Sequence, residues 1–298
     1  MRVGVALDST GDLDRATLEA YGLESAPVVV LVDGRELEAG PEADRAAFAR
    51  LLAGTPVEKI STSGVNVEAW GEAVDRLRAR GAGSVLLLSL ASTLSGTHRS
   101  AVAAARLAEP FPVRVVDSGT ASCGLAALAL SAARLAASGA SLEEMEGWVR
   151  KAAARTRTIL ASRDTSILRH LGRLLEAEPG GSPEYVLLDL GARIRPLGAA
   201  EGVEEAVERL AALFREHWQG GDGPEGGWQL VIGHGGNADA ARRLEERLGQ
   251  LAPAGQRFHV LRVDDGPIFT LLSRGPGGFG LGAAPLPGRL DEAGAARV

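Results

Sequence analysis

Residues 85–97 read VLLLSLASTLSGT and decide the fold, because they join a buried strand to a hydroxyl-rich turn. The run from Val85 to Leu90 is short, apolar and of strand length, and we expect a helix from the end of the turn to about Ala108. The same succession of strand, polar turn and helix recurs through the first half of the chain. It predicts a parallel sheet with right-handed crossovers.

Three other apolar runs of the first half are also followed by Ser, Thr and Asp. The turns after them are Asp8-Ser9-Thr10, Ser61-Thr62-Ser63-Gly64 and Asp117-Ser118-Gly119-Thr120. In an open parallel sheet, ligands bind beyond the carboxyl ends of the strands, so we expect the four turns to meet at one crevice. Hydroxyls and free backbone N–H groups at helix N-termini suit a carboxylate or a phosphate. For any single turn, the alternative is that Ser and Thr only cap helices.

Helices and further strands complete the first half. Pro27 to Val32 is predicted as a strand that ends in the turn Asp33-Gly34. A long Ala/Leu helix follows the fourth turn and extends to about Ala137. Ser141 and Glu144 have capping-box spacing and predict the start of the next helix.

The second half predicts a mixed sheet rather than a purely parallel one. A hairpin is expected around Gly191, and helices are expected at Val203–Trp218 and over residues 234–248, with a surface loop, QGGDGPEGG, at 219–227. The expected strands are Thr158–Ser162, Val186–Leu190, Ala192–Leu197, Trp228–Ile232, His259–Val263 and Pro267–Ser273. The predicted fold class is therefore α/β in two lobes, a parallel-sheet lobe at 1–155 and a mixed-sheet lobe at 156–298.

Composition excludes several classes of protein. The chain has 298 residues with a net charge of −6, which disfavours electrostatic binding of nucleic acid. Its single cysteine, Cys123, permits no internal disulfide and fits a reducing compartment. The N-terminus lacks the pattern of a signal peptide, and no apolar stretch is long enough to span a bilayer. We therefore expect a cytoplasmic protein.

Residue spacing excludes or weakens other chemistries. Lys59 and Lys151 are followed by Ile60 and Ala152, so there is no Walker A loop. The five histidines are scattered, so no metal site is expected. Two glycine-rich segments, GHGGNA at 233–238 and GPGGFG at 275–280, imitate a dinucleotide fingerprint. Neither has its full context, and nucleotide or sugar binding is kept as a weaker alternative.

A cluster of cations stands out in this acidic chain. Between residues 150 and 173 the only acid is Asp164, and the cations are Arg150, Lys151, Arg155, Arg157, Arg163, Arg169 and Arg173. Such a patch predicts an anionic partner, such as a membrane surface. The alternative is a solvated face of an arginine-rich protein.

Short motifs along the whole chain resemble the DegV family of bacterial fatty-acid-binding proteins. Their order and spacing carry the resemblance, and they are Asp8-Ser9-Thr10 with Asp12-Leu13, Thr62-Ser63, Leu94-Ser95-Gly96-Thr97, Asp117-Ser118, Gly172-Arg173, His234 with Asn237, and Gly275-Pro276-Gly277.

The resemblance implies a two-lobed unit, over roughly residues 3–284, that holds a long-chain fatty acid such as palmitate in a tunnel. It implies that Thr62 and Ser95 bind the carboxylate. It also implies a carrier without enzymatic activity or cofactor, which presents the acid to a separate fatty acid kinase. We expect a secondary shell around the head group at Ser63, Gly96, Ser118 and Ser273, the last of which stands where the family usually has His.

Two further expectations concern the tunnel. Its candidate walls are the Ala/Leu helix from Gly124 and the apolar stretch Ile268–Leu272. Its head-group donors are expected to be neutral, because a close arginine would hold a carboxylate too firmly for handover.

The alternative from another class is a serine-dependent acyl-ester or thioester hydrolase that uses Ser95. Its weakness is the missing base, since only His98 lies near Ser95 in the sequence.

Overall fold

The computed structural model describes residues 2–177, 180–218, 226–251, 257–263, 266–273 and 276–288. Its first half contains a four-stranded sheet with strand order β2-β1-β6-β7. All neighbours in this sheet are parallel, as the alternating pattern predicts. The strands are β1 (Val3–Asp8), β2 (Leu23–Ala26), β6 (Ser84–Ser89) and β7 (Val113–Asp117).

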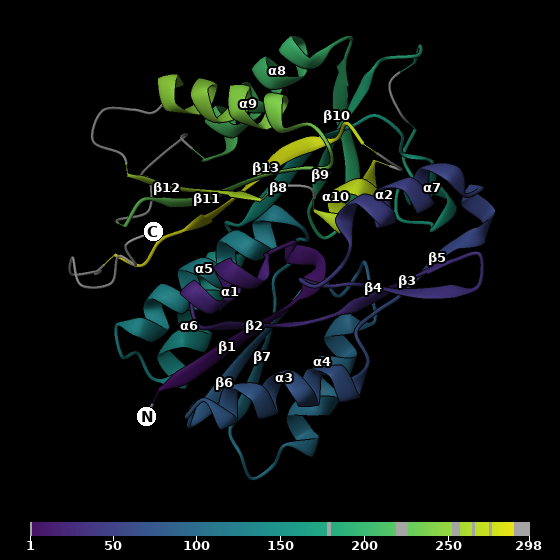
Figure 1. Ribbon diagram of the computed structural model, residues 1–298. Helices are drawn as coiled ribbons and strands as arrows, with labels where there is room; N and C mark the ends of the chain where they lie inside the picture. Colours follow the sequence, from purple (N-terminus) through teal and green to yellow (C-terminus); the bar gives the residue numbers. More distant parts are fainter. Residues whose placement is uncertain are drawn as a thin grey trace.

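Helices cover both faces of this sheet (Figure 1). The strands β1 and β6 are buried along their whole length, which is why their sequences are continuous apolar runs. One face carries α3 (Val67–Ala79) and α4 (Thr97–Leu107), and the other carries α5 (Cys123–Ala137) and α6 (Leu142–Ala153). The predicted capping box at Ser141 and Glu144 is present at the start of α6. The short helix α1 (Arg15–Ala20) links β1 to β2.

A separate three-stranded antiparallel sheet has strand order β4-β3-β5. It consists of β3 (Val28–Val32), β4 (Arg35–Ala39) and β5 (Ile60–Ser63), and the helix α2 (Arg45–Gly54) and a 3-10 turn (Val57–Lys59) separate β4 from β5. The prediction that Thr62 lies in a turn of the parallel sheet is therefore wrong. The run around Ile60 is too short to show by pattern alone which sheet it joins.

The second half forms a six-stranded mixed sheet of order β10-β9-β8-β13-β11-β12. Among the described strands of this sheet, only β11 and β12 pair in parallel, and the predicted hairpin joins β9 to β10. The strands are β8 (Arg157–Ser162), β9 (Tyr185–Leu190), β10 (Ile194–Ala200), β11 (Trp228–His234), β12 (Phe258–Val263) and β13 (Phe279–Pro285). The helices α8 (Val203–Trp218) and α9 (Ala238–Leu251) cover its outer face (Figure 1).

The predicted strand at Pro267–Ser273 is wrong, because residues Pro267–Leu272 form the helix α10. Proline occupies the first turn, where its missing N–H costs nothing, and all six residues are buried. A short apolar run of this kind has no period that separates a buried helix from a strand. The final strand is instead β13, which pairs with β8 and β11.

The helix α5 packs against strands of the four-stranded sheet and of the six-stranded sheet. At the closest approach, a Cβ on Gly282 of β13 would lie 2.1 Å from the backbone nitrogen of Gly124, so only glycine fits there. The lobe boundary near residue 155 stays a prediction, and most of the predicted loop at 219–227 lies outside the described residues. In the described part of the chain, no helix has the length and apolar character needed to cross a membrane.

Candidate functional site

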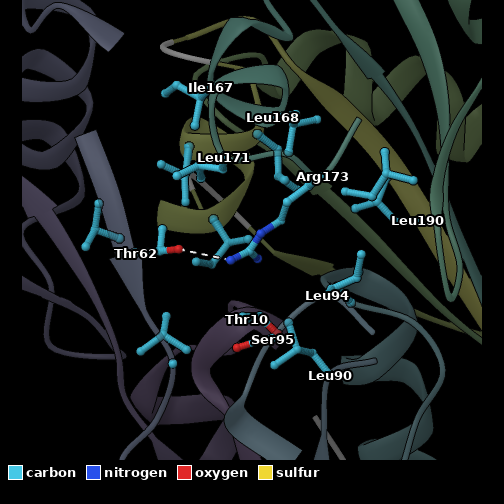
Figure 2. A pocket seen from close by; sticks show the side chains of 18 of the residues that line it. Thr10, Thr62, Leu90, Leu94, Ser95, Ile167, Leu168, Leu171, Arg173 and Leu190 are labelled. Atoms are coloured by element: carbon cyan, nitrogen blue, oxygen red, sulfur yellow. Dashed lines mark hydrogen bonds between the residues drawn. The ribbon is translucent and has the colours of Figure 1, made fainter. Parts of the chain in front are cut away.

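A pocket lies where the ends of β1 and β6 meet the three-stranded sheet and two short helices of the second half (Figure 2). About 670 Å³ within its outline is free of atoms, a figure that includes open solvent at its mouth. Aliphatic side chains form most of the wall, and hydroxyls with one guanidinium form the polar part. The lining residues are Thr10, Val28, Val30, Thr62, Ser63, Gly64, Leu90, Leu94, Ser95, Ala121, Ile167, Leu168, Leu171, Arg173, Leu190, Ile194, Ile268, Leu271 and Leu272.

The two residues predicted to hold a carboxylate, Thr62 and Ser95, both line this pocket. Thr62 lies on β5, and Ser95 lies in the loop between β6 and α4. The hydroxyl of Ser95 is 2.9 Å from Oγ1 of Thr97 and accepts a hydrogen bond from the Thr97 backbone N–H at 3.3 Å. Both lining side chains are half-buried, so the polar part of the pocket lies near solvent.

Close packing at Gly64 brings Thr62 to the same part of the pocket as Ser95. A Cβ at Gly64 would lie 2.6 Å from Oγ1 of Thr97 and 2.8 Å from Oγ of Ser95. The next residue, Val65, donates its backbone N–H to Oγ1 of Thr97 at 3.1 Å. Glycine after the Thr-Ser pair therefore lets the end of β5 dock on the Ser95 loop, although the two segments belong to different sheets.

Arg173 points into the pocket, and its Nη2 donates to Oγ1 of Thr62 at 3.2 Å (Figure 2). The expectation of neutral donors without a close arginine is therefore wrong. Burial lowers the pKa of Arg173, but a guanidinium remains charged at neutral pH. Arg173 stands in the motif Gly172-Arg173, but no pattern in the sequence indicates that its half-buried side chain points into a pocket.

Thr10 adds a further hydroxyl to the lining. Its hydroxyl and its backbone N–H both donate to Oδ1 of the buried Asp8. The other oxygen of Asp8 accepts the Leu90 backbone N–H at 2.6 Å, which joins the turn after β1 to the turn after β6. Burial raises the pKa of Asp8 to about 6, although these hydrogen bonds oppose the shift.

Six of the thirteen apolar lining residues come from α7 (Ser166–His170), the residues just after it, and α10. The predicted stretch Ile268–Leu272 does contribute, through Ile268, Leu271 and Leu272, but as a helix. The other predicted wall, α5, contributes none of the lining residues; only Ala121, two residues before its start, does. The helix α5 is part of the core between the four-stranded and the six-stranded sheets.

The four residues expected around the head group do not gather at one place. Ser63 lines the pocket, whereas Gly96 is the exposed N-cap of α4 outside the lining. Ser118 is fully buried and donates to the backbone oxygen of Thr120 at 3.1 Å. Ser273 is buried beside Gly278, and its hydroxyl has no hydrogen-bond partner among the described residues.

Within the described part of the chain, no catalytic base lies within hydrogen-bond reach of Ser95. His98 directs Nδ1 to the hydroxyl of Ser89 at 2.9 Å, while Ser95 pairs with Thr97. A nucleophile needs a base within hydrogen-bond reach, and the proposed pair of Ser95 and His98 is not formed. Among the described residues, no group of three His, Cys, Asp or Glu side chains is placed to hold a metal ion.

The cations between residues 150 and 173 do not form one face. Arg150 pairs with Glu146 on α6 at 2.7 Å, and Arg155 stacks over the ring of Trp228. Arg173 lies in the pocket. The structure thus divides the predicted patch among several environments.

The glycines of GHGGNA make room for protein rather than for a phosphate. A Cβ on Gly233 would lie 2.5 Å from the ring of Phe269, and one on Gly235 would lie 3.0 Å from Thr270. His234 uses Nδ1 to accept the backbone N–H of Asn237. Close contact with α10 explains this segment.

Comparisons with known proteins agree with these features. The family model described as "Uncharacterised protein, DegV family" matches residues 2–180. A DegV domain-containing protein of Streptomyces coelicolor is 33% identical and covers 88% of this chain and 92% of its own. A fatty acid-binding protein of Thermotoga maritima is 28% identical over 95% of this chain and 97% of its own. A solved structure described as fatty acid binding of a DegV family protein from Thermus thermophilus matches with a TM-score of 0.78 and 26% identity, over 96% of this chain and 100% of its own. This chain therefore belongs to the DegV family.

Proposed function

We propose that this protein binds one long-chain fatty acid, with the acyl chain in the pocket and the carboxylate at Thr62, Ser95 and Arg173. The observation that carries the proposal is the division of one pocket into an aliphatic wall and a polar part, here called the rim, which consists of Thr10, Thr62, Ser95 and Arg173. Two hydroxyl donors and a guanidinium suit a carboxylate, and the charge-assisted contact fixes its orientation. The relatives named for fatty acid binding support the same ligand class.

The acyl chain supplies most of the affinity. Each buried methylene contributes about 0.8 kcal/mol, so a palmitoyl chain gains on the order of 10 kcal/mol before the entropic costs of binding. Hydrogen bonds at the rim add about 1.5–3 kcal/mol each when they meet a charged group. The rim therefore orients the acid, and the wall retains it.

Truncation of the rim tests this assignment. The double variant Thr62→Ala with Ser95→Ala should fold normally and bind palmitate about 100-fold more weakly, as measured by isothermal titration. The matched control is Ser61→Ala with Ser92→Ala, which removes two exposed hydroxyls from the same segments outside the lining. Equal affinities for the two double variants would refute the head-group assignment.

We further propose that the protein acts as a carrier that presents the carboxylate to a separate fatty acid kinase. The family resemblance motivates this step, and the half-buried rim supports it because a partner can reach Thr62 and Ser95 from solvent. A fatty acid kinase from the protein's source cell should consume ATP with the palmitate-loaded protein and not with the rim double variant. If the kinase consumed ATP at the same rate with and without the palmitate-loaded protein, the partnership would be excluded.

A further inference from the structure

The helix α10 forms part of the pocket wall but has no capping side chain of its own. Its N-cap is Gly266, and its six residues amount to fewer than two turns. Helices this short depend on their surroundings for stability. Because Ile268, Leu271 and Leu272 line the pocket, whatever fixes the N-terminus of α10 also fixes that part of the wall.

Asp12 supplies the missing cap from the opposite end of the chain. Its Oδ1 accepts the backbone N–H of Ile268 at 3.0 Å, and its Oδ2 accepts that of Phe269 at 3.1 Å. Asp12 is 5% exposed. Gly266 passes so close that a Cβ there would lie 2.4 Å from Oδ2. The carboxylate thus satisfies two N–H groups that a helix start leaves unpaired.

The other described hydrogen bonds that join α10 to the rest of the protein are between neutral groups. The Gly266 N–H donates to the backbone oxygen of His234 at 3.0 Å, and the hydroxyl of Ser162 donates to the backbone oxygen of Leu272 at 3.0 Å. A bond to an ionised carboxylate is roughly twice as strong as a neutral one. Asp12 is therefore the strongest of these polar contacts.

We propose that Asp12 is a positioning residue of the pocket, whose carboxylate holds α10 against the acyl chain and slows release of the ligand. The identity of the ligand rests on the proposed function, whereas the hydrogen bonds between Asp12 and α10 do not depend on it. Asp12 itself lines no part of the pocket, so it acts through α10 and not by contact with the acid.

The surroundings of Asp12 make its hydrogen bonds to α10 sensitive to pH. Burial raises its pKa to about 7, opposed by the two backbone hydrogen bonds and by the charge of Arg45 on α2. The pKa of the Cys123 thiol at the start of α5 is raised by burial and, to a smaller extent, by the charge of Asp12. Protonation leaves Asp12 neutral and weakens both bonds to α10. Both bonds favour the ionised carboxylate, so a local opening of α10 that leaves Asp12 buried is easier once Asp12 is protonated. Ligand release by this local opening should therefore accelerate as the pH falls through about 7, whereas global unfolding, which also exposes Asp12 to water, has the opposite pH dependence.

Release kinetics test the proposal. The protein is loaded with cis-parinaric acid, and its fluorescence is followed after addition of excess albumin. At about pH 8, Asp12→Asn should release the probe about ten-fold faster than the wild type. The matched control is Asp14→Asn, which weakens the cap on α1, where Oδ1 accepts the Thr17 N–H at 2.7 Å, and should release at the wild-type rate. Towards about pH 6 the wild type should approach the rate of Asp12→Asn, whose own rate changes less.

Amide hydrogen exchange of the ligand-free protein separates this proposal from the proposed function. Residues 266–272 should exchange about ten-fold faster in Asp12→Asn than in Asp14→Asn. If the wild type bound no fatty acid but this difference appeared, the proposed function would fail and the role of Asp12 would stand. Unchanged exchange and unchanged release would overturn the proposal. If Asp12→Asn failed to fold, the wild type would be measured at about pH 6 and pH 8. The proposal would then be overturned if the amides of α10 gained no protection from exchange relative to those of α1 as the pH rose.

Discussion

The polar rim and the apolar wall of the pocket are built in different ways. Thr10 and Ser95 come soon after two adjacent strands of one sheet, and Asp8 ties these strand ends together. The wall depends on α7 and α10, two helices of five and six residues from distant parts of the chain. Local sequence therefore places Thr10 and Ser95, whereas long-range packing places the wall and brings Thr62 and Arg173 to the rim.

This difference predicts two classes of phenotype. A change at the rim should alter how the head group is recognised and leave the preference for chain length intact. A change in the wall should alter the chain-length preference and leave recognition of the carboxylate intact. Variants that mixed the two effects would show that the rim and the wall do not act separately.

The largest effect is expected from a bulky side chain in the wall. Ala121 lines the pocket and is 6% exposed. Ala121→Phe should fill acyl space and lower palmitate affinity about 100-fold, since exclusion of about four methylenes costs roughly 3 kcal/mol. The affinity for octanoate, measured by the same titration, should change little. Equal losses for both acids would contradict a role in chain length.

Loss of the rim cation should have a smaller effect. Arg173→Met removes the guanidinium that bonds Thr62 and should weaken palmitate binding about 30-fold, while hexadecanol binding stays close to that of the wild type. Arg173→Lys should recover only part of the loss, because an ammonium is a point charge without the fork of the guanidinium. If the acid and the alcohol lost affinity alike, Arg173 would act in packing rather than in recognition.

The pH dependence of stability should follow the two buried aspartates behind the rim and the wall. The folded pKa values of Asp8 and Asp12 are raised to about 6 and about 7, from 3.8 when unfolded. Between these values the folded state binds more protons, so the free energy of unfolding should fall as pH rises from about 4 to about 7.

Each of these aspartates contributes at most about 1.4 kcal/mol per pH unit within its window. Thermal unfolding of Asp12→Asn should show a shallower decline than the wild type over this range. An unchanged pH profile would mean that Asp12 does not titrate there.

The smallest effect is expected at the dispersed cations. Arg150 and Arg157 are exposed and lie away from the pocket lining. Because the cations of this segment lie in different environments, Arg150→Glu with Arg157→Glu should leave palmitate transfer to anionic vesicles unchanged. A clear loss of transfer, reversed by salt, would restore the predicted anionic-surface patch.

The sequence predicts the rim better than the wall, for physical reasons. Apolar runs of strand length locate β1, β6 and β7, and the residues after them follow from parallel topology. Thr62 reaches the rim by another route, at the end of an antiparallel strand that Gly64 allows to pack closely on Ser95. The prediction of its place in the fold was wrong, yet the residue does line the pocket.

The wall and the hydrogen bonds of Asp12 to α10 could not be predicted from the sequence, because they depend on contacts between distant residues. The run Ile268–Leu272 is apolar throughout, so its pattern fits a strand as well as a buried helix. The contact of Asp12 with α10 spans more than 250 residues, and a lone aspartate in a turn signals only a local cap. Arg173 likewise looks solvent-exposed until α7 is placed over the pocket.

The most direct test of the account is the content of the pocket in the protein as purified. Denaturation, solvent extraction and mass spectrometry should detect nearly one long-chain fatty acid per wild-type chain, and far less in Ala121→Phe. A wild-type extract without fatty acid, together with no uptake of palmitate on titration, would contradict the account.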